Sequence, residues 1–93
     1  MKSLKVKFTA LAGVRKTPIF TNYRPDWKSD RKPEYNGAML TFTEPQMVYP
    51  GDSCEGILHP IRPDLWTVEV GDMLDCMEGS RKVGEAIVIE LLP

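Results

Sequence analysis

Few side chains of this 93-residue sequence are suited to catalysis. His59 is the only histidine, and no neighbouring serine or acid marks it as a member of a catalytic triad. Cys54 and His59 are two potential zinc ligands, whereas a structural zinc site takes four ligands at characteristic spacings. Asp72, Asp75 and Glu78 recur every third residue, and we interpret them as solvated acids because glycines bracket the segment. We therefore expect a non-catalytic protein with no metal and no cofactor.

Basic side chains are concentrated in the first third of the sequence. Residues 1–33 hold nine lysines and arginines against two aspartates, a net charge of +7, and the rest of the chain balances at −8. Tyr23, Trp27 and Tyr35 lie among these cations, and aromatic rings beside cationic side chains can stack on single-stranded bases. The same charge run also suits ordinary solvated strand faces. A nucleic-acid-binding face and a solvated surface are therefore both open interpretations of this segment.

The elements that position these side chains must be short, because chain-breaking residues are frequent. Eight prolines and seven glycines divide the sequence, and beyond residue 12 no uninterrupted stretch exceeds eight residues. A mean helix has about 11–12 residues and an internal proline breaks it, so helices of ordinary length are nearly excluded. Leu4, Val6, Phe8 and Ala10 alternate with polar residues, which is typical of a strand with one buried face. We expect an all-β protein, either a sandwich or a barrel of short antiparallel strands.

Turn residues divide the remaining chain into further strands. Residues 85–92 are so rich in β-branched side chains that we expect a central strand with both faces covered. Pro50 and Gly51 stand at the central positions of a type II turn over residues 49–52, and residues 77–81 suit a hairpin reversal. Trp27 and Trp66 are expected to be core anchors. The strands that we expect are residues 4–10, 17–20, a short segment near Trp27 within a long loop at 22–36, 38–43, 46–49, 53–58, 65–70, 73–77 and 85–92.

Four motifs follow one another along the chain. They are Gly13-Val14-Arg15-Lys16-Thr17-Pro18, Tyr23-Arg24-Pro25, Met47-Val48-Tyr49-Pro50-Gly51-Asp52 and Glu78-Gly79-Ser80-Arg81-Lys82-Val83-Gly84. In order and spacing they resemble the C-terminal (third) domain of elongation factor Tu, which has a Gly-Gly-Arg turn, a Tyr-Arg-Pro loop, a Met-Pro-Gly-Asp turn and a Glu-Gly-Gly-Arg hairpin. The resemblance extends over residues 4–92. It implies a small closed antiparallel β-barrel, in agreement with the strand pattern.

The resemblance also implies where partners bind. In the family, this barrel docks on the GTPase domain and on the nucleotide exchange factor, and it touches the T stem of aminoacyl-tRNA. Arg15 matches the arginine of the family turn, and Glu78 and Gly79 match the Glu-Gly of the hairpin, at positions that meet RNA in the family. The basic and aromatic residues nearby extend this set. The full set of candidate partner-binding or RNA-binding residues is Arg15, Lys16, Tyr23, Arg24, Lys28, Glu78 and Gly79.

At three matched positions the sequence departs from the family. Asp26 replaces a glutamine, Asn36 replaces a threonine and Met77 replaces an arginine. The anion gained at Asp26 and the cation lost at Met77 both oppose the binding of phosphates, which depends on lysine and arginine. The sequence also lacks a Gly-x4-Gly-Lys-Ser/Thr phosphate loop, since Gly84 is followed by Glu85. We therefore expect no bound nucleotide.

Together these observations predict one domain over residues 1–93, an all-β, small closed antiparallel β-barrel that binds partners without catalysis. The first function class is a protein–protein interaction module linked to translation factors, acting by docking, as a decoy or as an immunity-like partner. The alternative is binding of the tRNA or RNA backbone through a basic N-terminal face. Two cysteines, no signal-peptide stretch and no apolar run of about 18 residues predict a cytoplasmic protein that does not enter membranes.

Overall fold

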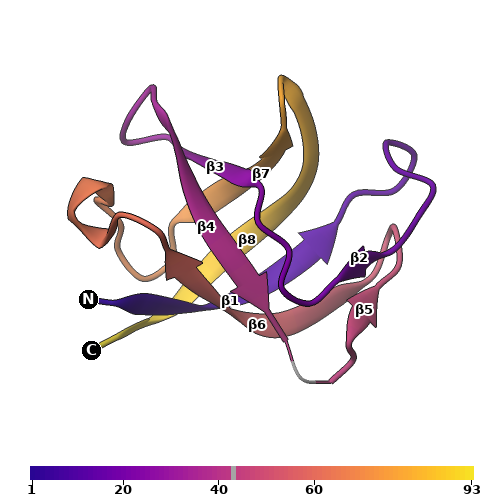
Figure 1. The fold of residues 1–93 in the computed structure, drawn as a ribbon, viewed down its shortest axis with the longest axis horizontal. Coiled ribbons are helices and arrows are strands. Elements are labelled where there is room, and N and C mark those ends of the chain that lie inside the picture. Colours follow the sequence, from indigo (N-terminus) through magenta and orange to yellow (C-terminus); the bar gives the residue numbers. More distant parts are fainter. Residues whose placement is uncertain (43) are drawn as a thin grey trace.

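The computed structural model describes residues 1–42 and 44–93, and these residues form short strands with one single-turn helix (Figure 1). In chain order the elements are β1 (Ser3–Ala10), β2 (Ile19–Phe20), β3 (Asp26–Ser29), β4 (Tyr35–Thr41), β5 (Met47–Val48), β6 (Ser53–Pro60), the 3-10 helix η1 (Pro63–Leu65), β7 (Met73–Glu78) and β8 (Arg81–Leu92). The predicted all-β class is confirmed. Within these ranges no helix has the length and apolar character needed to cross a membrane. Thr43, in the predicted strand 38–43, lies outside the described residues.

Six of the strands close into a barrel in the order β1-β6-β4-β3-β7-β8. Every pairing around this barrel is antiparallel, and β8 completes it by pairing with β7 on one side and with β1 on the other. β2 and β5 form a separate two-stranded sheet beside the barrel (Figure 1). The predicted small closed antiparallel barrel is therefore confirmed. Closure leaves the six barrel strands without an unpaired edge.

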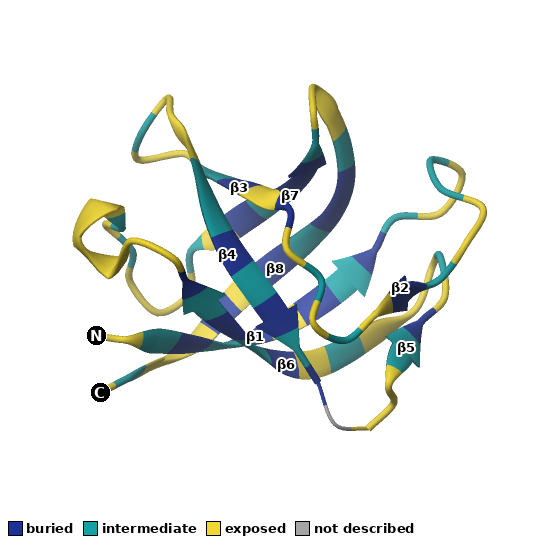
Figure 2. Cartoon of the chain, in the orientation of Figure 1, coloured by how far each residue is buried: buried dark blue, intermediate teal, exposed yellow. Residues whose placement is uncertain are grey.

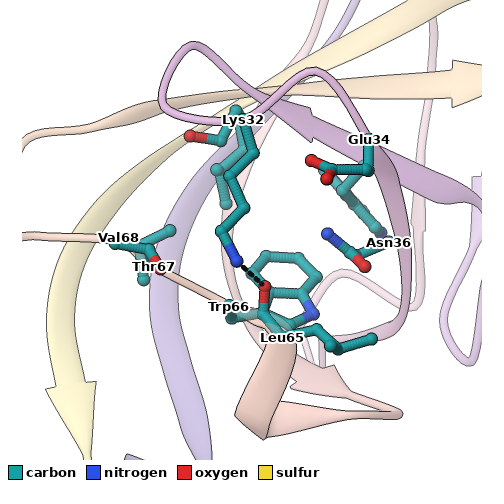
Figure 3. Close-up of a pocket in the computed structure, with 10 residues that line it drawn as sticks. Lys32, Glu34, Asn36, Leu65, Trp66, Thr67 and Val68 are labelled. Atoms are coloured by element: carbon teal, nitrogen blue, oxygen red, sulfur yellow. Dashed lines mark hydrogen bonds between the residues drawn. The ribbon is translucent and has the colours of Figure 1, made fainter.

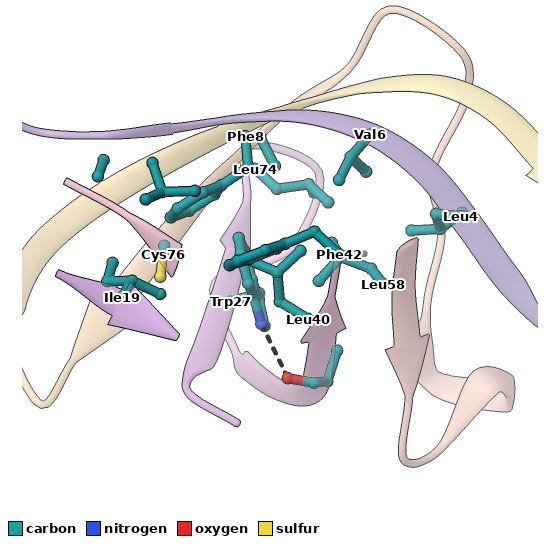
Figure 4. Packing of buried hydrophobic residues seen from close by; sticks show 14 of the residues in the cluster. Leu4, Val6, Phe8, Ile19, Trp27, Leu40, Phe42, Leu58, Leu74 and Cys76 are labelled. Carbon is teal, nitrogen blue, oxygen red and sulfur yellow. Dashed lines mark hydrogen bonds between the residues drawn. The ribbon is translucent and has the colours of Figure 1, made fainter. Parts of the chain in front are cut away.

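Alternating strand positions supply the side chains that fill the barrel (Figure 2). On β1, Val6 and Phe8 are fully buried, and Lys7 between them is exposed on the outside. Trp27 of β3 is also buried, as predicted, and its ring packs edge-to-face on Phe8 with 6.0 Å between the ring centroids (Figure 4). Its indole Nε1 donates a hydrogen bond to the Ala38 carbonyl oxygen at 3.1 Å. Trp27, the largest buried side chain, is therefore both closely packed and hydrogen-bonded in the core.

Both predicted chain reversals are confirmed. In residues 49–52, the Asp52 amide donates to the Tyr49 carbonyl oxygen at 2.9 Å. Gly51 has a φ of 96°, the positive value that a type II turn requires at its third position. β7 and β8 form the second reversal, a hairpin whose closing pair is Glu78 and Arg81. The two turns therefore follow from local turn chemistry.

The predicted strand at 65–70 is wrong. Residues 63–65 form the single turn η1, and residues 66–69 have no regular secondary structure. Pro63 has a backbone angle suited to the first position of a helical turn, and the Trp66 amide donates to the Pro63 carbonyl oxygen at 3.1 Å. An ion pair of 2.9 Å between Arg62 and Asp64 spans the same turn. Trp66 is half-buried against the core, so it is a less complete anchor than Trp27.

The prediction that both faces of residues 85–92 are covered is also wrong. β8 is central in the sense that it has a neighbour on each side, and its inward side chains Val83, Ala86 and Val88 are buried. Ile87 and Ile89, by contrast, are 41% and 38% exposed. The reason is architectural, because a single barrel buries only the inner face of each strand and no second layer covers the outer face.

Gly84 of β8 lies close against the Phe8 ring and the backbone of β1. A Cβ atom at this position would lie 2.7 Å from Cε1 of Phe8 and 3.0 Å from the Thr9 carbonyl oxygen. We expect Gly84→Ala to lower the free energy of unfolding by about 1–3 kcal/mol, because overpacking displaces a buried ring or the β1 backbone. Urea unfolding measures this loss.

Gly37→Ala is the matched control, also within a barrel strand. Its Cβ would meet only the tip of the flexible Ile61 side chain, at 3.0 Å, so we expect a smaller loss. Equal losses in the two variants would contradict the close packing of β8 on Phe8.

Candidate functional site

An open hollow of about 630 Å³ lies between the loop that follows β1 and the β7–β8 hairpin. Residues 13–17 line one side, and Glu78 and Arg81 line the other. The Leu11 amide donates to the Val83 carbonyl oxygen at 3.0 Å, so the start of the loop is tied to β8. The barrel therefore fixes both walls of this hollow, which we call the Arg15 hollow.

Glu78 is the centre of the polar contacts at the Arg15 hollow. Its Oε2 accepts hydrogen bonds from Nη1 of Arg15 and from the Tyr23 hydroxyl, and its Oε1 accepts one from Nη2 of Arg81 at 3.2 Å. The guanidinium carbon of Arg15 lies 5.5 Å from the centre of the Tyr23 ring, within the range of a cation–π contact. Tyr23 is itself held by backbone hydrogen bonds to Leu40 of 3.1 and 2.6 Å. These contacts give Arg15 a defined orientation.

The same contacts set the ionisation of Glu78 and Tyr23. Burial opposes the ionisation of Glu78, but hydrogen bonds from Tyr23 and Arg81 and the charge of Arg15 outweigh it and lower the pKa of Glu78. Burial, together with the hydrogen bond to Glu78, raises the pKa of Tyr23 above its ordinary value. At neutral pH the glutamate is therefore an anion and the tyrosine a neutral donor.

The Arg15 hollow keeps a net positive charge although a carboxylate lies at its centre. Arg15, Lys16 and Arg81 line it together with the single acid Glu78. Lys16 is exposed, so its ammonium group is accessible to a ligand. Cations that converge on an open hollow suit a phosphate or carboxylate group, to which they donate charge-assisted hydrogen bonds.

Most of the predicted candidate residues meet at this place. Arg15, Lys16 and Glu78 line the hollow, and Tyr23 is hydrogen-bonded to Glu78. Gly79 follows Glu78 in the hairpin, with a positive φ of 64°. The sequence thus identified a set of residues that the fold brings together from three separate segments.

Arg24 and Lys28 are the candidates that the fold does not bring to the hollow. Neither is among the residues that line it. Lys28 lies on β3, where its register partners are Asp75 of β7 and Tyr35 of β4. Arg24 is exposed in the segment before β3.

Arg81 is the charged residue lining this site that the candidate set omitted. It lies within the fourth motif, and it faces Glu78 because the two residues form the closing pair of the hairpin. The signal that could have identified it is the two-residue spacing Glu78-Gly-Ser-Arg81, since residues that flank a two-residue turn are cross-strand neighbours.

Acids from the later part of the chain mix with the basic N-terminal third. Nζ of Lys5 lies 3.6 Å from a carboxylate oxygen of Glu55. Arg31 makes hydrogen bonds of 2.6 and 3.0 Å to Asp72 and one of 3.1 Å to Glu69. Surface ion pairs thus compensate part of the +7 charge of residues 1–33, whereas cations outnumber acids among the residues that line the Arg15 hollow.

A second feature of this part of the molecule is an aromatic surface on the small β2–β5 sheet. Phe20 and Tyr49 are 56% and 55% exposed, and half-buried Met47 is the register partner of Phe20. Ile19 and Val48 alternate with these residues and are buried in the core. We call Phe20, Met47 and Tyr49 the β2–β5 surface.

A smaller pocket lies under the segment that contains η1 (Figure 3). Lys32, Glu34 and Asn36 border it, and Trp66 forms part of its wall. Nζ of Lys32 donates to the Leu65 carbonyl oxygen at 3.0 Å. This bond joins the β3–β4 loop to the η1 segment, so we interpret the pocket as a small gap left where these two loops pack together.

The side chains that could act as nucleophile or base are held in structural contacts. Burial raises the pKa of the Cys54 thiol, and burial with the nearby charge of Glu78 raises the pKa of Cys76 to about 12. Both thiols are therefore protonated and unreactive at neutral pH. His59 Nε2 lies 2.9 Å from the Thr41 hydroxyl oxygen, across the β4–β6 ladder.

No family model matches the chain.

The lowered pKa of Glu78 predicts a pH dependence of stability. A carboxylate whose pKa is lower in the folded state contributes stability that is fully present above its unfolded pKa of about 4.3. That stability is lost as the pH falls through the folded pKa. Glu78→Gln cannot ionise, so we expect its free energy of unfolding to decrease less than that of the wild type between about pH 5 and pH 3.

Urea unfolding over a pH series checks this difference. Asp64 and Asp72, whose pKa values are also lowered by arginine partners, are present in both proteins, so the difference between the two curves reports on Glu78. Parallel curves would show that the Arg15 and Tyr23 contacts to Glu78 do not form in solution.

Proposed function

We propose that this chain is a non-catalytic protein–protein interaction module linked to translation factors. The observation that carries the proposal is the β2–β5 surface, where Phe20 and Tyr49 each leave more than half of their area exposed. Phe20 lies three residues after Thr17, which lines the Arg15 hollow. The loop that lines the Arg15 hollow therefore leads directly into the β2–β5 surface.

This combination has the composition of a protein interface. Aromatic residues, methionine and arginine are enriched in interface centres, and tyrosine and arginine are frequent among the residues that dominate binding energy. The β2–β5 surface is also fixed in place, because Ile19 and Val48 anchor the back of the small sheet in the core. A surface that is already ordered loses little conformational entropy when a partner docks on it.

The motif resemblance supports the class of partner. The matching barrel of elongation factor Tu docks on its own GTPase domain and on the nucleotide exchange factor. A separate barrel with the same motifs would compete for those surfaces, acting as a docking factor, a decoy or an immunity-like partner. The cytoplasm is the compartment that this role requires, and Cys54 and Cys76 would stay as free thiols there.

Binding to purified translation partners tests the proposal. The probes are the GTPase domain of elongation factor Tu and its nucleotide exchange factor, each titrated against the purified chain. We expect at least one to bind, with a weak dependence on salt, and the double variant Phe20→Ala/Tyr49→Ala to raise the dissociation constant by at least about thirtyfold.

Ile61→Ala is the matched control, because Ile61 is 53% exposed and lies beside β4, away from the β2–β5 surface. Its binding should equal that of the wild type. Retention of RNA with no binding of either protein would overturn the proposal.

Binding of the RNA backbone is the second candidate function. The observation that favours it is the excess of cations at the Arg15 hollow, where Arg15, Lys16 and Arg81 face one glutamate. Because Glu78 already holds Arg15 and Arg81, a phosphate would share these guanidinium groups with it and bind Lys16 directly.

A comparison of two lysine variants tests RNA binding. We expect Lys16→Ala and Arg15→Ala each to weaken tRNA retention and to lower the slope of log affinity against log salt by about one. Lys28→Ala removes the same charge outside the hollow, so its affinity should stay near that of the wild type. Filter binding over a salt series measures all three variants, and equal values for Lys16→Ala and Lys28→Ala would exclude the hollow as the RNA site.

A further inference from the structure

A second apolar surface lies on the outside of the barrel, further along β8 from the Arg15 hollow. Val70, Met73, Ile87 and Ile89 form it, and we call it the β8 face. These four side chains are 61%, 39%, 41% and 38% exposed. Contiguous exposed apolar side chains are uncommon on a monomeric surface and mark interaction sites.

The strand register makes the β8 face continuous. Ile87 lies between two cross-strand partners, Lys7 on β1 and Met73 on β7. The register between β1 and β8 shifts between Lys5 and Val6, which leaves Ile89 as the extra residue of a bulge on β8. Ile89 and the next residue, Glu90, are both exposed, so the bulged residue lies on the outside of the barrel.

The segment before β7 extends this surface. The Gly71 amide donates to the Val88 carbonyl oxygen at 2.8 Å, and the Val88 amide donates to the Asp72 carbonyl oxygen at 2.9 Å. These bonds hold Val70 alongside the outer end of β8. The β8 face thus spans β7, β8 and the segment that leads into β7.

The two margins of the β8 face carry opposite charges. Lys7 is exposed on the β1 margin, level with Ile87. Asp75 lies on the β7 margin, two residues after Met73 and on the same side of the strand. Nζ of Lys82 lies 3.0 Å from Asp75 Oδ1 and 2.8 Å from Glu85 Oε1, so two acids share one lysine and these three side chains leave a net negative charge beside the β7 margin. A surface with a cation at one edge and an anion at the other is self-complementary under a two-fold axis.

We propose that the β8 face binds a second copy of this chain, with a two-fold axis parallel to β8. This axis places the β1 margin of each copy over the β7 margin of the other, so that Lys7 of one chain approaches Asp75 of the other. A two-fold axis across the strands would place the two Lys7 side chains over each other. The charges therefore favour the two-fold axis parallel to β8, and the burial of Ile87 and Ile89 drives the association.

Sedimentation over a concentration series tests the association. We expect the wild type to pass from monomer to dimer and Ile87→Glu to raise the dimer dissociation constant by at least about tenfold. Ile61→Glu adds the same charge at an exposed isoleucine beside β4 and should leave the association unchanged. A wild type that stays monomeric throughout, or a dimer that Ile87→Glu does not weaken, overturns the proposal. Circular dichroism checks that each variant is folded.

A charge exchange tests the arrangement of the two chains. Lys7→Glu opposes Asp75 in its own homodimer, and Asp75→Lys opposes Lys7 in its own, so each variant alone should dimerise more weakly than the wild type. In an equimolar mixture both contacts become attractive again, and we expect the mixed dimer to form at least about tenfold more tightly than either homodimer. A mixture that associates no better than its components overturns the two-fold arrangement.

Discussion

The closing contact between β8 and β1 is the constraint on which the rest of the structure depends. β8 has twelve residues and pairs with β7 at its start and with β1 along its length. Gly84 lets the Phe8 ring lie against the β8 backbone, and that ring in turn packs on Trp27. A side chain at Gly84 would separate the strands at the point where the circle closes. The Arg15 hollow and the β8 face have their observed positions because β1 and β8 pair and close the barrel.

The polar site follows from the same closure. The hairpin that starts β8 carries Glu78 and Arg81, and the loop that leaves β1 carries Arg15. When β1 and β8 pair, these residues from opposite ends of the sequence become neighbours around one carboxylate. Glu78 stays ionised because donors surround it, and it fixes the cations that line the hollow. The site therefore forms because the chain topology brings the loop after β1 beside the β7–β8 hairpin, and neither segment alone would form it.

The sequence predicted the features that depend on local patterns. The alternation in β1, the turn at 49–52 and the chain-breaker spacing were enough for an all-β sandwich or barrel, and the motif resemblance implied the closed barrel. Prediction from the sequence failed where contacts between distant segments determine the local structure. Residues 65–70 are rich in side chains that suit a strand, but Pro63 starts a helical turn there. Lys32, from the β3–β4 loop, donates a hydrogen bond to the Leu65 carbonyl oxygen. Ile87 is apolar and yet exposed. The prediction failed there because the amino-acid composition of a strand does not reveal how many layers cover it. Arg81 was omitted for a different reason, since its place opposite Glu78 follows from the two-residue spacing of the hairpin turn and could have been predicted.

We propose that the chain binds its partner through the β2–β5 surface and the Arg15 hollow, which the loop of residues 11–18 joins. The most direct measurement is the change in amide chemical shifts of the isotope-labelled chain when the purified GTPase domain of elongation factor Tu or its nucleotide exchange factor is added. The account predicts shifts that cluster in residues 15–20, 47–49 and 78–81 for at least one of the two. Shifts confined to β4 and β6, or no shifts with either protein, would contradict it.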